Sequence, residues 1–287
     1  MLAAATTGIQ VGAAIVATRF VVGEVTPVPL AFMRYAIGFC CLVPALAWSA
    51  RVRFARRDLA PIVLLGILQF AVVITLINYA LQFISSARAA LIFATFPVLT
   101  MVIAAALGQE RLTRSKSVGV LLSTVGVAFA VGDKAWQGSA SAGESWGALA
   151  VLGSALCGAL CSVLYRPYLR RYPALPVSAL AMLASVIFLA LFAAREGFFD
   201  QAPHLSATGA AAVVFIGASS GVGYFLWLWA LGRATPTRVT MFLALSPITA
   251  AALGALLLDE AITRGTLIGL GCVVFGLWLA LRQTPSG

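Results

Sequence analysis

The sequence has 287 residues, of which 62% are hydrophobic and only 10% are charged, and its mean hydropathy is +1.02. Soluble domains carry about 25% charged residues. The composition therefore excludes an ordinary soluble protein and indicates helices within a bilayer, from which charge is excluded. The net charge of +10 fits contact with anionic lipid headgroups, and we expect no nucleic-acid partner.

Ten stretches without Asp, Glu, Lys or Arg follow one another along the chain. A membrane-spanning helix needs about 20 mostly apolar residues. The two shortest stretches extend past a flanking Arg or Lys, whose flexible stem carries the charge to the membrane surface. In chain order the stretches are 1–18, 35–50, 59–87, 89–109, 117–132, 145–165, 172–194, 205–232, 239–258 and 265–281. They predict an all-α integral membrane protein of ten transmembrane helices.

Lys and Arg residues are distributed unevenly between the connections of these helices. With the N-terminus in the cytoplasm, 13 of the 19 basic residues lie in inside segments and six lie outside. The positive-inside rule therefore predicts that both termini are cytoplasmic. The first stretch has no basic segment before it and no clear cleavage site, so we expect it to be retained as a helix.

The chain repeats itself with a shift of 150 residues. The segment that begins at Ala80 aligns without a gap with the segment that begins at Ala230. The identities in register include Arg88/Arg238, Ala94/Ala244, Pro97/Pro247, Glu110/Glu260, Thr113/Thr263, Arg114/Arg264, Gly119/Gly269 and Gly126/Gly276. Each repeat holds five helices, and because five is odd the second repeat is inverted in the membrane. The predicted units are residues 1–133 and 146–287, joined by a linker at 134–145.

Three motifs relate the chain to a known family. They are "FMRYAIGF" in the second helix and the helix ends "FPVLTMVIAAALGQERLT" and "SPITAAALGALLLDEAIT". With them the chain resembles the drug/metabolite transporter superfamily, EamA-type. The resemblance implies a bacterial inner-membrane exporter of amino acids, including aromatic ones, or of other small metabolites. It also implies that helices 1–4 and 6–9 line a central cavity. We expect no cofactor or metal, and action as a monomer.

The proline pair gives the first candidate functional residues. Pro97 and Pro247 each lack a backbone donor and leave a carbonyl without a partner four residues earlier, at Phe93 and Leu243. Such a kink either lets the helix bend as a gate or merely shapes the packing. In inverted-repeat transporters the substrate is expected near the midplane of the membrane, between the two repeats. We predict gating roles for the two prolines, and also for the glycines of the eighth helix, Gly221 and Gly223.

Polar and aromatic residues inside the apolar stretches are the candidates for substrate binding. Uncharged amides and hydroxyls in a bilayer point inward, where they bind either substrate or a neighbouring helix. Tyr224 and Trp227 lie three residues apart and either stack on a substrate or belong to an interfacial aromatic belt. The predicted binding residues are Gln10, Asn78, Tyr79, Gln82, Tyr165, Tyr224 and Trp227.

Charged residues near the helix ends allow alternative roles. Arg88 and Arg238 bind a carboxylate or extend to lipid headgroups, and Glu110 and Glu260 either cap the next helix or pair with Arg114 and Arg264. All nine acidic residues lie outside the apolar stretches, so no intramembrane proton carrier is visible and facilitated export is predicted. An exporter of lipophilic cations with the same fold is the alternative. A membrane-embedded enzyme would need a clustered catalytic site, which the sequence lacks.

Overall fold

The chain is helical throughout the part that the computed structural model describes. The described residues are 2–49, 52–110, 142–201, 203–262 and 264–282, together with 118, 122 and 125, and none of them forms a β-strand. The all-α prediction is confirmed. The predicted fifth helix and most of the predicted linker lie outside the described residues.

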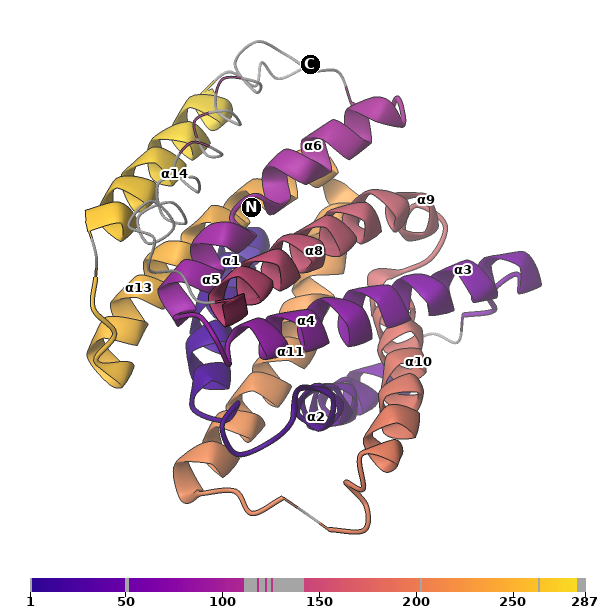
Figure 1. Cartoon of the computed structure of the whole chain (residues 1–287). Coiled ribbons are helices and arrows are strands. Elements are labelled where there is room, and N and C mark those ends of the chain that lie inside the picture. The colour runs from indigo at the N-terminus through magenta and orange to yellow at the C-terminus, as the bar shows by residue number, and fades with distance from the viewer. Residues whose placement is uncertain are drawn as a thin grey trace.

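The described helices cross one another at varied angles, and several of the predicted spans consist of more than one segment (Figure 1). The elements of the first half are α1 (Leu2–Arg19), α2 (Pro27–Ala47), α3 (Arg56–Gly66), the π-helical η1 (Ile67–Val72), α4 (Val73–Ala80), α5 (Ser86–Phe93) and α6 (Phe96–Ala106). The elements of the second half are α8 (Ala142–Leu164), α9 (Arg166–Leu169), α10 (Ala174–Arg195), α11 (Ala207–Arg233), α12 (Pro236–Thr240), the 3₁₀-helical η2 (Met241–Ala244), α13 (Leu245–Leu258) and α14 (Arg264–Arg282).

Seven helical segments within the described residues are long and apolar enough to cross a membrane. They are Pro27–Ala47, Arg56–Ala80, Ser86–Ala106, Ala142–Leu169, Ala174–Arg195, Ala207–Arg233 and Pro236–Leu258. The first helix, α1, has 18 residues, and α14 lies at one edge of the bundle (Figure 1). The protein is therefore a multi-pass membrane protein, and the count of ten helices stays a prediction.

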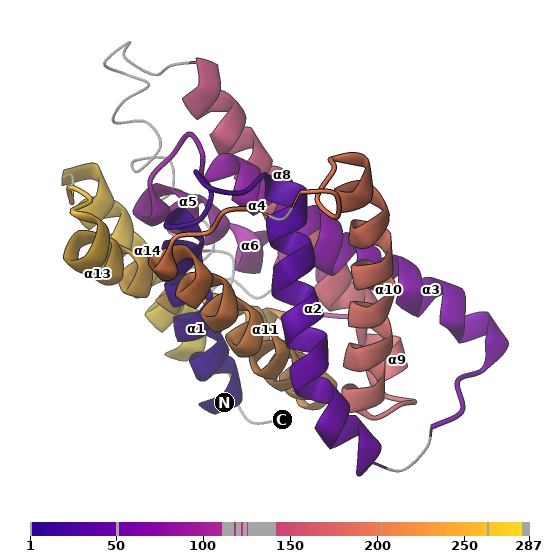
Figure 2. The ribbon, with the colours of Figure 1, turned by 90° about the horizontal axis from the view of Figure 1, so that it is seen from below.

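The two halves pack on each other through equivalent helix pairs. In the first half α2 packs against α11, and in the second half its counterpart α10 packs against α3 and η1. Likewise α1 packs against η2 and α13, while α8 packs against α5 and α6. The equivalent helices α2 and α10 also pack against each other, so they meet where the two halves join. Figure 2 shows α2 between α11 and α10. This pairing is what two related repeats require.

Glycine sets the distance between the helices at two of these crossings. A Cβ atom added at Gly221 would lie 2.5 Å from the carbonyl oxygen of Gly38, so the backbones of α11 and α2 are almost in contact. A Cβ atom at Gly66 would lie 2.4 Å from the carbonyl oxygen of Ala181, which puts α3 equally close to α10. Small residues permit such approach in membrane helices, where packing rather than the hydrophobic effect drives association.

Both proline-containing spans lose regular α-helical geometry just before the proline. The span Ser86–Ala106 is interrupted at Ala94 and Thr95, and the span Pro236–Leu258 narrows to the 3₁₀ segment Met241–Ala244. Because proline cannot donate to the residue four positions earlier, the preceding turn tightens or breaks. The π-helical segment η1 likewise interrupts the third predicted span, between α3 and α4.

Candidate substrate cavity

A cavity of about 90 Å³ lies at the centre of the bundle, where the interrupted helices meet. Its walls come from α1, α2, η1, α4, α5, α6, α11 and η2. The cavity thus uses spans from both halves of the chain, although α8 and α10, which the family resemblance also implied, contribute no lining residue among those described. Phe93 and Leu243, the residues whose carbonyls the two prolines leave without a helical partner, both line it.

One side of the cavity is aromatic. The rings of Phe93 and Phe96 lie 5.2 Å apart, and Trp227 meets Phe96 edge to face at 6.1 Å between ring centroids. Tyr224 is packed against Phe70 at 4.2 Å, which fixes its ring on the floor of the cavity. Edge-to-face geometry of this kind is favourable for aromatic pairs and leaves ring faces for an apolar ligand group.

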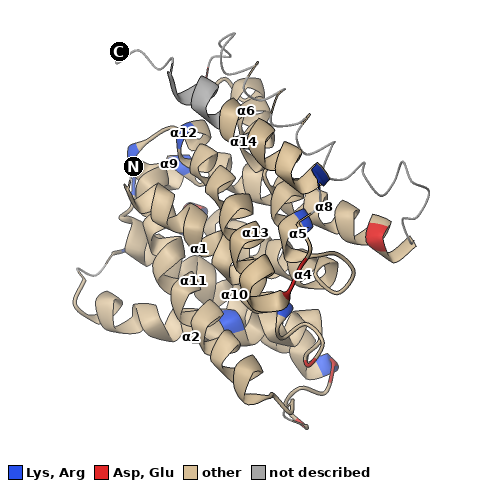
Figure 3. Ribbon diagram, turned by 90° about the vertical axis from the view of Figure 1, so that its left-hand side faces the viewer, with Lys and Arg blue, Asp and Glu red and all other residues tan. Residues whose placement is uncertain are grey.

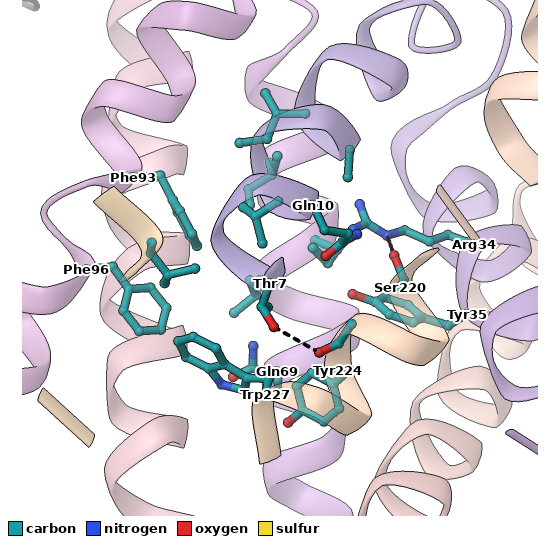
Figure 4. Close-up of a pocket in the computed structure, with 18 residues that line it drawn as sticks. Thr7, Gln10, Arg34, Tyr35, Gln69, Phe93, Phe96, Ser220, Tyr224 and Trp227 are labelled. Atoms are coloured by element: carbon teal, nitrogen blue, oxygen red, sulfur yellow. Dashed lines mark hydrogen bonds between the residues drawn. The ribbon is translucent and has the colours of Figure 1, made fainter. Parts of the chain in front are cut away.

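The opposite side is polar. Figure 4 shows Arg34, Tyr35 and Ser220 across the cavity from Phe93 and Phe96. The Arg34 Nε donates to the Ser220 hydroxyl at 2.7 Å, and the Gln10 side chain donates to the Ser219 hydroxyl at 3.2 Å. The cavity is therefore amphipathic: a hydrogen-bonding side with one fixed positive charge faces an aromatic side.

Arg34 is the functional candidate that sequence reasoning missed. Its place beside the second apolar stretch suggested an outer connection, yet the structure places it inside α2, about seven residues and hence ~10 Å from the start of that helix at Pro27. It is 7% exposed. The signal available in the sequence was that the apolar stretch 35–50 is too short to span a bilayer unless the helix begins before Arg34.

The predicted binding residues divide between the cavity and its surroundings. Gln10, Tyr224, Trp227 and Gly223 line the cavity. Four others do not: Asn78 donates to the Pro27 carbonyl at 3.0 Å, Gln82 donates to the Val22 carbonyl at 3.4 Å, Tyr79 is 38% exposed, and Tyr165 is buried beside Tyr224 at 6.5 Å between ring centroids. Gly221 lies at the close crossing with Gly38 rather than in the wall.

Glu260 closes one end of the helix bundle. Its carboxylate accepts hydrogen bonds from the Ser86 backbone N–H at 3.0 Å, from the Ser86 hydroxyl at 2.5 Å and from the Ala87 N–H at 3.4 Å. These donors form the first turn of α5, which belongs to the other half of the chain. A carboxylate at a helix N-terminus satisfies unpaired N–H groups and complements the helix dipole.

Glu110 occupies the equivalent place at the other proline-containing span. Its carboxylate accepts a hydrogen bond from the Thr237 N–H at 3.1 Å, in the first turn of α12. Both glutamates reach across because the chain turns back at positive φ just before them, at Gly108 (φ 67°) and Asp259 (φ 51°). Of the two alternatives from the sequence, neither describes Glu260 fully: it caps a helix, but in the opposite half, and its nearest cation is Arg19 at 4.0 Å.

The remaining charges are sparse and lie mostly on the bundle surface. Arg88 pairs with Glu144 at 2.9 Å, so this arginine binds a carboxylate of the chain itself. Lys, Arg, Asp and Glu occupy only a few places along the described ribbon (Figure 3). Within the described residues no group of His, Cys, Asp or Glu is arranged to hold a metal ion.

Comparison with known proteins identifies the fold and its general role. The model of the EamA-like transporter family matches residues 1–132 and 145–282. The chain belongs to the EamA-like transporter family. An uncharacterized transporter of Archaeoglobus fulgidus is 25% identical over 95% of each chain, and a probable terminal-alkyne amino-acid exporter of Streptantibioticus cattleyicolor is 29% identical over 79% of this chain and 75% of that one.

A solved crystal structure shares the fold of this EamA-like chain. It matches with a TM-score of 0.77 over 98% of this chain and 96% of its own, at 23% sequence identity. The family and its transporter relatives support the role of a membrane transporter. The central amphipathic cavity is built by residues of both halves of this transporter.

Proposed function

We propose that this transporter exports amino acids, aromatic ones included, by facilitated alternating access. The observation that carries the proposal is the central cavity, in which hydrogen-bonding groups face an aromatic wall across a site built by both halves of the chain. An amino acid has the same two-sided chemistry, with a charged end and a side chain that is often apolar. The amino-acid exporter from Streptantibioticus cattleyicolor, a relative at 29% identity, supports the same substrate class.

The size of the cavity supports a cycle in which the site opens and contracts. A cavity of about 150 Å³ holds one benzene ring, whereas this one encloses about 90 Å³. An aromatic amino acid therefore needs the walls to move apart. The interrupted spans beside Pro97 and Pro247 supply both movable walls, since Phe93 and Leu243 line the cavity one turn before the prolines. We assign the two prolines, with Gly221 and Gly223, to this movement.

The two glutamate caps are suited to act as gates. Each ties the end of one proline-containing span to the start of the other, Glu260 on Ser86 and Glu110 on Thr237. In the proposed topology, with both termini in the cytoplasm of a bacterial inner membrane, Glu260 lies outside and Glu110 inside. Release of one cap at a time opens the cavity to one side. A single chain contains both caps and the whole cavity wall, which suits action as a monomer.

Facilitated export follows from the groups that line the cavity. None of the described lining residues is Asp, Glu or His, the usual intramembrane proton carriers. The substrate's own gradient then drives export, which releases a metabolite only when it accumulates.

Counterflow in proteoliposomes tests this proposal. Purified protein should exchange labelled phenylalanine for internal unlabelled amino acids, and Trp227→Ala should reduce the exchange because it removes part of the aromatic wall. Tyr79→Ala, which alters an aromatic residue outside the cavity, is the matched control and should exchange normally. Exchange of lipophilic cations in place of every amino acid would establish the rival function.

A pH gradient imposed on vesicles with equal substrate on both sides should drive no net accumulation; accumulation abolished by a protonophore would overturn facilitated transport.

A further inference from the structure

The positive charge of Arg34 is buried without a negative partner in the part of the chain that the structure describes. Eight of the nine acidic residues are described, and none lies within ion-pairing distance of Arg34. Its Nε has one neutral partner, the Ser220 hydroxyl at 2.7 Å, and its Cζ lies 5.6 Å from the Tyr35 ring centroid. An isolated buried charge costs several kcal/mol, so a group that retains one this deep in a membrane protein points to a functional role.

Two explanations that give this arginine no functional role do not fit its geometry. It does not extend to the membrane surface, because it is 7% exposed and lies in the wall of the central cavity. Nor is it fully satisfied within the protein, because the structure gives its two terminal nitrogens no hydrogen-bond partner among the described residues, while Nε is held by Ser220. The guanidinium is thus oriented from behind and open on the side that faces the cavity (Figure 4).

We propose that Arg34, oriented by Ser220, is the subsite for the carboxylate of the transported molecule. This inference rests on the proposed function and narrows its substrate class to monocarboxylates with an apolar body. Guanidinium donors are arranged in a planar fork that matches the two oxygens of a carboxylate. One carboxylate neutralises the guanidinium, so a simple monocarboxylate leaves the cavity neutral and an amino acid leaves only its ammonium charge, which needs an acceptor of its own. A dianionic phosphate would leave excess charge, and a lipophilic cation would add a second positive charge.

The rest of the cavity fixes the orientation of such a molecule. With its carboxylate at Arg34, the apolar body extends toward Phe93, Phe96 and Trp227 on the opposite side (Figure 4). The buried side-chain oxygen of Gln69 also lines the cavity and has no hydrogen-bond partner among the described residues. It is an acceptor for the ammonium group of an amino acid, because a buried polar atom without a partner is unfavourable until a donor arrives.

The test compares three ligands on detergent-purified protein by ligand-induced thermal stabilisation. Phenylalanine has both charged groups, phenylalaninamide lacks the carboxylate, and 3-phenylpropanoate lacks the ammonium. Wild-type protein should bind the two carboxylates at least about tenfold more tightly than the amide, as expected for a charge-assisted pair. Arg34→Met should weaken both carboxylates by about 10- to 100-fold, whereas the cationic amide should bind as before or more tightly, since a like charge is removed. Arg34→Lys should recover part of the loss.

Further variants keep the test decisive. Ser220→Ala should weaken the same two ligands by a smaller factor, since it removes only the group that orients Arg34. Arg233→Met, which changes an exposed arginine on α11, is the matched control and should bind all three ligands as wild type does. Equal binding of the amide and phenylalanine by wild-type protein would overturn the subsite, as would tight phenylalanine binding by a folded Arg34→Met protein. If carboxylates bind through Arg34 but no exchange occurs in vesicles, the subsite stands and the transport proposal fails.

Discussion

The two halves of the protein use the same helix crossings but place different side chains at them. Where α2 crosses α11, a Cβ atom at Gly221 would meet the carbonyl oxygen of Gly38, and where α10 crosses α3, a Cβ atom at Gly66 would meet the carbonyl oxygen of Ala181. Yet α2 buries the cation Arg34, whereas the residues that α10 buries are all uncharged. The close crossings are thus alike in the two halves, while the one charged residue among the described lining residues comes from the first half.

The glutamate caps differ in the same way. Glu260 accepts from both the N–H and the hydroxyl of Ser86, whereas the residue in register with Ser86 in the second half is Pro236, which has neither donor. The Ser86 side therefore offers a hydroxyl and an N–H that Pro236 cannot supply at the other end. For the proposed gates we expect the cap formed by Glu260 to be the harder one to release.

The largest effects are expected at the crossings, where the two halves are alike. Gly66→Ala and Gly221→Ala each force a Cβ against a backbone carbonyl, at 2.4 Å from Ala181 and 2.5 Å from Gly38. Because neither contact is with a flexible side chain, the helices must separate, at a cost of about 1–3 kcal/mol. Thermal unfolding in detergent should show both losses, and similar sizes would support equivalent crossings.

Gly153→Ala is the control for these two variants. Its added Cβ would meet only the end of Leu76, at an ordinary 3.7 Å. Alanine is favoured over glycine inside a helix by roughly 0.5–1 kcal/mol, so this variant should unfold at the same temperature or higher. A loss as large as at Gly66 would mean that any added methyl group disturbs the bundle.

The next effect concerns the unequal caps. Glu260→Gln weakens three hydrogen bonds to the first turn of α5 and should lower the free energy of unfolding by about 1–2 kcal/mol, because charge-assisted bonds are the stronger kind. Glu110→Gln should cost less. The rate at which a thiol reagent labels a cysteine introduced beside either cap, measured separately in each variant, reports which end of the cavity opens. If Glu110→Gln opens its end more than Glu260→Gln opens the other, the inferred order of strength is wrong.

Much of the fold could be predicted from the sequence because bilayer physics acts on composition. Apolar stretches between charges located the spans, and all seven long helices of the described chain fall on predicted stretches. The central role of Gln10, Tyr224 and Trp227 in lining the cavity also followed, since polar and aromatic residues in mid-helix have few other places to point.

The rest of the site depends on which helix faces which, and one sequence does not encode this openly. Asn78 and Gln82 lie four residues apart on one helix face, which is a spacing typical of binding residues. Their side chains instead donate hydrogen bonds to the carbonyls of Pro27 and Val22 in neighbouring segments. Arg34 lies in the second-helix motif "FMRYAIGF", and the sequence counts its charge on the outer side of the membrane, whereas its burial in the cavity wall depends on how α2 packs. The glutamate caps join residues 174 and 127 positions apart, pairings that no local signal reveals.

The proline-containing spans of the two halves can be compared by the rate of substrate exchange. Pro97→Ala and Pro247→Ala each restore a backbone donor, so the spans should straighten and resist the movement that widens the cavity. We expect exchange to slow by about threefold to tenfold in each variant, a rise in barrier of up to ~1.4 kcal/mol, with little change in binding. Initial exchange rates and thermal-shift affinities separate these effects. Wild-type exchange in both variants would make the kinks packing features.

The smallest effect is a pH dependence that belongs to one half. In the loop after α1, Glu24 accepts from the Ser206 hydroxyl at 2.6 Å and from the Ser206 N–H at 2.9 Å, which secures the start of α11. These hydrogen bonds hold the pKa of Glu24 below its usual range. At the corresponding place in the other half, donor and acceptor are exchanged between loop and helix: Tyr172 and Arg171 of the loop donate to Asp58 at the start of α3.

A depressed folded-state pKa contributes stability that is present above the unfolded pKa, near 4.3 for glutamate, and is lost as the pH falls through the lower folded value. The wild-type protein should therefore unfold at a slightly higher temperature than Glu24→Gln at about pH 7, and the difference should shrink as the pH falls below about 4.3. Comparing the two proteins at each pH cancels the titration of Asp58, which both contain. The shift should be smaller than for the buried sites, because Glu24 is exposed to solvent. A difference that persists unchanged at low pH would show that Glu24 acts through packing or neutral hydrogen bonds, and that its charge does not secure α11.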